Sequence, residues 1–128
     1  MASPTPHHQT SRERLIRSYL KAMERGDLAG VLSCFQQDAV IISPVYGLEH
    51  PARFYERLFA DTIETSLSIH SIYASTQDET LWIAHFTYEW RRKSAPTIQT
   101  NLIDLFEFAE DDHRLKRLRI VFDTDARP

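Results

Sequence analysis

One acidic side chain interrupts an apolar stretch near the end of the chain. The residues around it alternate with period two, which is typical of a β-strand, and Asp104 shares one face with Leu102, Phe106 and Phe108. A carboxyl group in apolar surroundings has a raised pKa, because the loss of water disfavours its anion. A neutral carboxylic acid donates a hydrogen bond at pH 7, so Asp104 could bind a carbonyl oxygen or stabilise an oxyanion.

A second potential hydrogen-bond donor is Tyr19, which lies on the apolar face of the first predicted helix. If its phenol and the Asp104 carboxyl converge in a dry pocket, the pair could hold a carbonyl group during proton transfer. A second interpretation needs no ligand: Asp104 bonds to Tyr19, Tyr88 or the backbone and only stabilises the core, as most buried polar groups do. The sequence leaves both interpretations open.

An aromatic stripe supplies candidate walls for such a pocket. Phe86, Tyr88 and Trp90 fall on one face of a predicted strand, and this stripe is either plain core or pocket lining. Tyr46, in the loop after an earlier strand, is a candidate for the pocket mouth. The predicted catalytic residues are therefore Tyr19 and Asp104, and the predicted ligand-binding residues are Ser43, Tyr46, Phe86, Tyr88, Trp90, Leu118, Ile120 and Phe122.

The beginning of the chain is expected to contribute a tail and a helix. Residues 1–9 contain no apolar stretch, so they are expected to form a disordered tail rather than a secretory signal, followed by a single domain over residues 10–125. Thr10 and Glu13 have the spacing of a capping box, and Gly26 is suited to end the first helix.

Further elements follow from their own start and stop signals. Asp27 is placed to cap a second, short helix, and Pro51 fits the first turn of a third helix. Between these helices, Val40 to Ser43 is predicted to form a strand that ends at Pro44. Four longer segments with period two then complete the chain, which predicts four more strands.

The last two strands are expected to form a hairpin whose register decides where the acid lies. Pairing Glu107 with Arg117 places opposite charges across from each other, and the same register pairs Asp104 with Ile120. A slip of one residue would bring Asp104 opposite Arg119 instead. The first register is favoured because it separates apolar from charged side chains.

This order of elements predicts an α+β domain, because the helices are segregated from a run of antiparallel strands. Both faces of the late strands carry apolar residues. One face can pack on the helices, and a partner subunit is the simplest cover for the other. We therefore expect a homodimer.

Composition restricts the classes of function. The 128 residues include 15 Lys+Arg and 18 Asp+Glu, a net charge of −3, so no nucleic-acid partner is expected. No apolar run approaches the length of a membrane helix, so no membrane partner is expected. The single cysteine, Cys34, permits no internal disulfide and favours a reducing, cytoplasmic location. Neither ligand spacing for a metal nor a glycine-rich phosphate loop is present, so we predict no metal and no cofactor.

A series of short motifs occurs in a characteristic order: Tyr19-Leu20-Lys21-Ala22, Gly26-Asp27-Leu28, Phe35, Asp38-Ala39-Val40, Ser43-Pro44-Val45, Phe54-Tyr55, Asp104-Leu105-Phe106-Glu107-Phe108 and Arg119-Ile120-Val121-Phe122-Asp123. In this order, over about residues 12–123, the chain resembles the nuclear transport factor 2-like superfamily, in particular its SnoaL-like and ketosteroid-isomerase-like members. The resemblance implies a cone-shaped, cystatin-like fold, in which three N-terminal helices pack on a strongly bent antiparallel sheet around a pocket. Such proteins are usually dimers.

The resemblance also implies roles for individual residues. Tyr19 and Asp104 match the tyrosine and the protonated aspartate in the oxyanion hole of ketosteroid isomerases. Ser43 stands where those enzymes keep their aspartate base, and a serine hydroxyl is a poor base unless a neighbour activates it, so ketosteroid isomerase activity is not expected. SnoaL-like cyclases use an aspartate late in the chain. Asp104 and Asp123 are the candidates here, and alternation places Asp123 on the face opposite Ile120.

Two functional hypotheses result. In the first, a SnoaL-like domain binds an apolar, carbonyl-bearing small molecule, and any catalysis is an isomerisation or cyclisation whose base is unidentified. In the second, the chain is a non-catalytic dimerisation or binding module that keeps the fold and fills the cavity with its own side chains.

Overall fold

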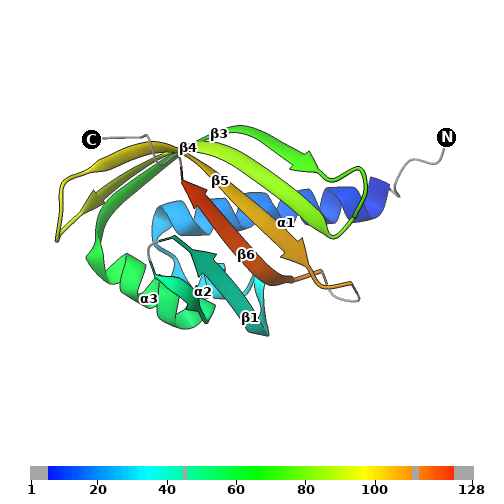
Figure 1. The fold of residues 1–128 in the computed structure, drawn as a ribbon, viewed down its shortest axis with the longest axis horizontal. Helices are drawn as coiled ribbons and strands as arrows, with labels where there is room; N and C mark the ends of the chain where they lie inside the picture. Colours follow the sequence, from blue (N-terminus) through cyan, green and yellow to red (C-terminus); the bar gives the residue numbers. More distant parts are fainter. Residues whose placement is uncertain (1–5, 45, 111–112, 123–128) are drawn as a thin grey trace.

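A strongly bent sheet wraps around the helices of this protein (Figure 1). The computed structural model describes residues 6–44, 46–110 and 113–122. Within these residues, the elements in chain order are α1 (Pro6–Arg25), α2 (Leu28–Leu32), β1 (Phe35–Ser43), β2 (Gly47–Glu49), α3 (Pro51–Asp61), β3 (Thr62–Ala74), β4 (Leu81–Arg92), β5 (Ile98–Phe108) and β6 (Leu115–Phe122). The predicted α+β class is confirmed.

The sheet has the strand order β2-β1-β6-β5-β4-β3. Neighbouring strands are antiparallel, as expected, with one exception: β1 and β6 are parallel, so the sheet is mixed. These two strands are separated by most of the chain, and no tight turn forces them into opposite directions. Helix α3 and the strands β3 to β5 provide the long crossover that a parallel pair requires.

The predicted register of the β5–β6 hairpin is confirmed. Glu107 pairs with Arg117, whose guanidinium lies 3.5 Å from the Glu107 carboxylate, and Asp104 pairs with Ile120. Because side chains alternate along a strand, this register keeps Asp104 on the inner face together with the buried Leu102 and Phe106. The charged pair lies on the outer face, in partial contact with water.

The core lies between the inner face of the sheet and the apolar sides of α1 and α3. Every second residue of β4, from Trp82 to Trp90, is buried, as the period-two pattern predicts. Helix α1 contributes Ile16, Tyr19 and Leu20 to this core, at the spacing of one helical face. None of the helices within the described ranges combines the length and apolar character that a membrane span requires.

The predicted caps of the short helices are present. The Asp27 carboxylate accepts a hydrogen bond of 3.0 Å from the backbone N–H of Gly30 and starts α2. At the start of α3, His50 Nδ1 accepts a hydrogen bond of 3.1 Å from the N–H of Ala52, and Pro51 occupies the first turn. Helices α2 and α3 therefore begin where their sequence signals indicate.

Several boundaries differ from those that we predicted. Helix α1 begins at Pro6 rather than Thr10, so residues 6–9 are helical; residues 1–5 lie outside the described part of the chain. Strand β1 begins at Phe35 because that end also pairs with β6. Strand β2 has three residues, too few for an alternating pattern to be recognised in the sequence.

Gly26 ends α1 in a left-handed conformation, with φ of 68°. The N–H of Gly26 donates to the Met23 carbonyl, and the N–H of Asp27 donates to the Ala22 carbonyl, which together form a Schellman motif. A side chain added at Gly26 would meet no atom within 4 Å, so only the backbone conformation restricts this position.

We therefore expect Gly26→Val to lower the free energy of unfolding by about 1–2 kcal/mol, because a β-branched residue resists the left-handed conformation. The matched variant Gly26→Asn should cost clearly less, since asparagine tolerates that conformation. Urea denaturation of the three proteins measures the difference. Equal losses for Val and Asn would contradict the assignment of the cost to backbone conformation.

Candidate functional site

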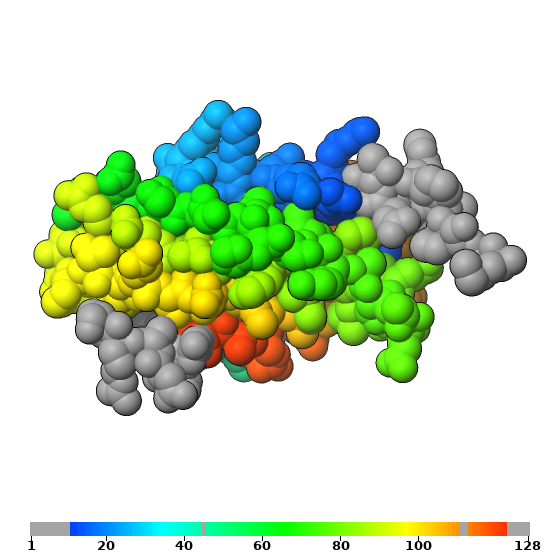
Figure 2. Space-filling model, turned by 90° about the horizontal axis from the view of Figure 1, so that it is seen from above, coloured from blue at the N-terminus to red at the C-terminus, as the bar shows by residue number. Residues whose placement is uncertain are grey.

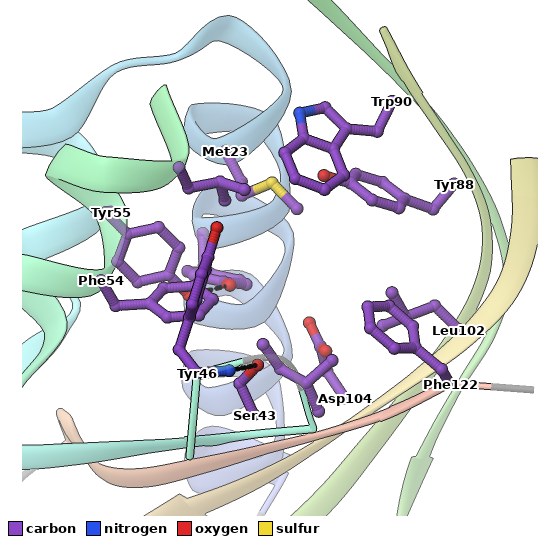
Figure 3. A pocket seen from close by; sticks show the side chains of 13 residues that line it. Met23, Ser43, Tyr46, Phe54, Tyr55, Tyr88, Trp90, Leu102, Asp104 and Phe122 are labelled. Atoms are coloured by element: carbon purple, nitrogen blue, oxygen red, sulfur yellow. Dashed lines mark hydrogen bonds between the residues drawn. The ribbon is translucent and has the colours of Figure 1, made fainter. Parts of the chain in front are cut away.

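A pocket opens between the inner face of the sheet and the two longer helices (Figure 3). It encloses about 480 Å³ of space, including its opening to solvent. Helices α1 and α3, strands β1, β4, β5 and β6 and the β1–β2 loop all contribute side chains. The lining residues are Tyr19, Met23, Ser43, Tyr46, Phe54, Tyr55, Leu58, Tyr88, Trp90, Leu102, Asp104, Ile120 and Phe122.

Asp104 is the only residue with a carboxylate or a basic group among the described residues of this lining. Its side chain rises from β5 into the pocket, and the residue is 2% exposed (Figure 3). Among the described residues, none forms a hydrogen bond with its Oδ1. Burial without a compensating charge raises the pKa of this carboxyl to about 8. Asp104 is therefore mainly a neutral carboxylic acid at pH 7.

Two tyrosines lie deep in the pocket and bond to each other. The hydroxyl of Tyr19, on α1, forms a short hydrogen bond with the hydroxyl of Tyr55, on α3. Burial, with the nearby Asp104 as a further contribution, raises the pKa of both phenols well above its usual value, so both are neutral at pH 7. Within a hydrogen-bonded pair of hydroxyls only one proton lies between the oxygens, which leaves the other proton available to a third group.

The far wall of the pocket is aromatic. Tyr88 and Trp90 on β4 stack with ring centroids 6.3 Å apart, and burial raises the pKa of the Tyr88 phenol. The indole Nε1 of Trp90 donates a hydrogen bond of 2.9 Å to Thr62 Oγ1, which fixes the ring. The guanidinium of Arg92 covers the outer side of Trp90, 4.7 Å from the ring centroid. Two aromatic rings, one of which carries a hydroxyl group, therefore form this wall.

Tyr46, which we predicted at the pocket mouth, lies among the lining residues. The backbone N–H of Tyr46 donates a hydrogen bond of 3.3 Å to Ser43 Oγ. The Tyr46 ring packs edge-on against the Phe54 ring, with the two ring centroids 5.6 Å apart. Arg57 lies over the same ring at 4.6 Å, and Glu49 holds this guanidinium through two bonds of 3.1 and 3.0 Å. The predicted mouth residue is thus held from both sides.

Most of the predicted site residues are brought together, and two are not. Of the predicted residues, Tyr19, Ser43, Tyr46, Tyr88, Trp90, Asp104, Ile120 and Phe122 line the pocket. Phe86 and Leu118, which we expected in the walls, lie instead in the closed core and are fully buried. Period-two alternation correctly assigns both to the inner face, but it does not indicate which part of that face the helices cover. Asp123 lies outside the described residues.

Our sequence analysis missed the helical part of the lining: Met23, Phe54, Tyr55 and Leu58, together with Leu102 on β5. A usable signal existed for two of them. Met23 follows Tyr19 by four residues and therefore shares its helical face, and Tyr55 lies on the same apolar face of α3 as Leu58. The Tyr19–Tyr55 contact itself depends on how α1 and α3 pack, which periodicity does not indicate.

Comparison with protein-family models finds one match, to the SnoaL-like domain, over residues 16–118. The chain belongs to the SnoaL-like family. Comparison with curated protein sequences finds no significant match. Comparison with solved structures, in contrast, finds many chains that are similar to this SnoaL-like protein.

Three of those structures illustrate the similarity. SalBIII, an epoxide hydrolase/cyclase-like enzyme of pyran ring formation in salinomycin, has a TM-score of 0.79 at 13% identity, with 92% of this chain and 95% of that chain covered. An M. tuberculosis LEH-like epoxide hydrolase has a TM-score of 0.74 at 21% identity, with 91% and 86% covered. A nuclear transport factor 2-like protein from Burkholderia pseudomallei has a TM-score of 0.73 at 18% identity, with 89% and 92% covered. At these identities the similarity concerns the fold, which agrees with the predicted superfamily.

The raised pKa of Asp104 predicts an unusual dependence of stability on pH. Below about pH 4 the carboxyl is protonated in both the folded and the unfolded chain. Between its usual value of 3.8 and about 8, only the unfolded chain releases the proton, so rising pH destabilises the fold by about 1.4 kcal/mol per pH unit. Above about pH 8 the Asp104 carboxyl is ionised in both the folded and the unfolded chain, and the destabilisation no longer increases.

Asp104→Asn removes this titration, so the variant should gain stability relative to the wild type as the pH rises from 4 to 8. Urea denaturation of both proteins at several pH values measures the difference. If the free energy of unfolding of the two proteins changed equally with pH across this range, a buried, neutral Asp104 would be contradicted.

Proposed function

We propose that this SnoaL-like protein binds an apolar small molecule that carries a carbonyl group, with Asp104 as the hydrogen-bond donor to the carbonyl oxygen. The observation that supports this most directly is a buried acid, neutral at pH 7, in a hollow lined mainly by aromatic and aliphatic side chains. Apolar pockets with few, well-placed polar groups are typical of small-molecule sites. The Tyr19–Tyr55 pair offers a second donor at the same end of the pocket.

The chemistry that this arrangement supports is proton transfer within one substrate, as in an isomerisation or a cyclisation. Asp104 delivers its proton to the carbonyl oxygen as the substrate forms its enol, and the carboxylate so formed accepts the proton that leaves the neighbouring carbon. The acid ends as it began, so no second base is required. Ser43 lies in the pocket lining, but no histidine is among the described residues there to activate it, which argues against steroid isomerisation with a separate base.

The alternative is a non-catalytic module of the same fold whose cavity is filled by its own side chains. The hollow that adjoins Asp104, Tyr46 and Trp90 favours the ligand-binding proposal. A filled core would also be expected to satisfy the Asp104 carboxyl internally, whereas its Oδ1 has no partner among the described residues.

To test the proposal, binding of α-tetralone, an apolar bicyclic ketone, can be followed at pH 6 through tryptophan fluorescence, to which the lining residue Trp90 contributes together with Trp82. We expect Asp104→Leu, which keeps the branched shape but removes the donor, to weaken binding about tenfold, the value of one good hydrogen bond in a dry site. The matched control is Asp38→Leu, at an exposed position of β1. Equal affinities for the wild type and Asp104→Leu, or no binding to the wild type, would contradict the proposal.

We also propose a homodimer formed through the outer face of the sheet, in a cytoplasmic setting. Figure 2 shows β3 between α1 and the other long strands, which together form one continuous surface. Across it run rows of paired apolar residues: Tyr73 pairs with Ile83, and Ile103 pairs with Val121. Tyr73, Ile103 and Val121 are 53%, 37% and 44% exposed, which is typical of a surface that a partner covers.

The variant Ile103→Glu places a charge in the middle of this face, so it should convert the dimer to a monomer while the far-ultraviolet circular dichroism is unchanged. Analytical ultracentrifugation measures the oligomeric state. Gln37→Glu, which adds a charge at an exposed position of β1, is the control. A wild-type chain that is monomeric at high concentration, or an Ile103→Glu dimer, would refute the proposed interface.

A further inference from the structure

We infer that the preferred ligand of this pocket carries a hydrogen-bond donor directly beside its carbonyl oxygen, as a secondary lactam or amide does. This inference rests on the proposed function and names its ligand class more narrowly. The reason is that a neutral Asp104 has both a hydrogen-bond donor and an acceptor, whereas a simple ketone has only an acceptor.

A neutral carboxylic acid offers two groups on one edge: an O–H that donates and a carbonyl oxygen that accepts. A ketone uses only the O–H. The second oxygen would then remain buried without a partner, and an unsatisfied buried acceptor costs about 1–3 kcal/mol. A lactam with N–H and C=O on the same edge satisfies both groups at once, through two parallel hydrogen bonds.

The protein itself supplies no donor to the second oxygen within its described residues. Asp104 Oδ1 has no hydrogen-bond partner there. The Trp90 N–H bonds to Thr62, and one of the two protons of the Tyr19–Tyr55 pair lies between the two hydroxyl oxygens. Oδ1 can therefore accept a hydrogen bond from a donor that a ligand brings into the pocket.

The carboxyl can present both oxygens to a ligand without distortion of the backbone. Rotation about its terminal torsion is soft, so an edge-on orientation toward the pocket costs little. The side chain already points into the hollow, between the Ser43 end and the Tyr88–Trp90 wall (Figure 3). The flat, aromatic surroundings also suit a planar amide, whose two polar atoms lie in one plane with the ring that carries them.

Four probes of nearly equal shape test the inference on the full-length protein. They are 3,4-dihydroisoquinolin-1(2H)-one, which is a lactam; its N-methyl derivative, which lacks the donor; α-tetralone, which replaces the N–H by CH₂; and 1,2,3,4-tetrahydroisoquinoline, a protonated amine. At pH 6 we expect the lactam to bind about tenfold more tightly than α-tetralone and the N-methyl derivative, because only the lactam satisfies both carboxyl oxygens. Isothermal titration calorimetry measures the affinities.

Two variants separate this pairing from a general packing effect. Asp104→Asn carries a carboxamide, which also has a donor beside an acceptor, so it should keep the preference for the lactam. Asp104→Leu should lose the preference. At pH 9.5 the ionised carboxylate of the wild type can no longer donate, so its affinity for the lactam should fall several-fold, whereas that of Asp104→Asn should not change.

The outcomes distinguish the two levels of the proposal. If α-tetralone binds the wild type as tightly as the lactam, the inference is wrong and the proposed carbonyl site survives. If the protonated amine binds most tightly, the carboxyl acts as an anion and the inference is also wrong. If none of the four probes binds, the proposed function fails together with the inference.

Discussion

The carboxyl group of Asp104 loses its water on folding and gains no charged partner among the residues that the structure describes. This loss of solvation favours the neutral form, and burial is the cause of its raised pKa. A carboxylate in the same place would act as a base or a cation site, whereas a neutral acid acts as a hydrogen-bond donor. The character of the whole pocket therefore depends on how well the surrounding side chains exclude water from this group.

Several parts of the fold together keep water away from the Asp104 carboxyl group. The pairing of β5 with β6 directs Asp104 inward, and a shift by one residue would direct it to solvent. Helices α1 and α3 then close the space above it, with the Tyr19–Tyr55 hydrogen bond joining the two helices. Tyr46, a further lining residue, contacts Phe54 and Arg57, which fix the position of its ring.

Much of this arrangement could be predicted from the sequence, because it depends on local rules. Alternation in β5 and the Glu107–Arg117 pair are enough to place Asp104 on the inner face, and the register confirms it. The parallel pairing of β1 with β6 and the contact of Tyr55 with Tyr19 depend instead on elements far apart in the chain. Phe86 and Leu118 show the same limit, since alternation gives the face of a residue but not the part of that face that stays open.

Nuclear magnetic resonance can observe the protonation state of the Asp104 carboxyl group directly. In a protein labelled with ¹³C at the aspartate carboxyl carbons, the Asp104 resonance can be assigned from its loss in Asp104→Asn and followed through a pH titration. We predict that the Asp104 titration has its midpoint at about pH 8. A midpoint near 4, the ordinary value for an aspartate in water, would contradict it.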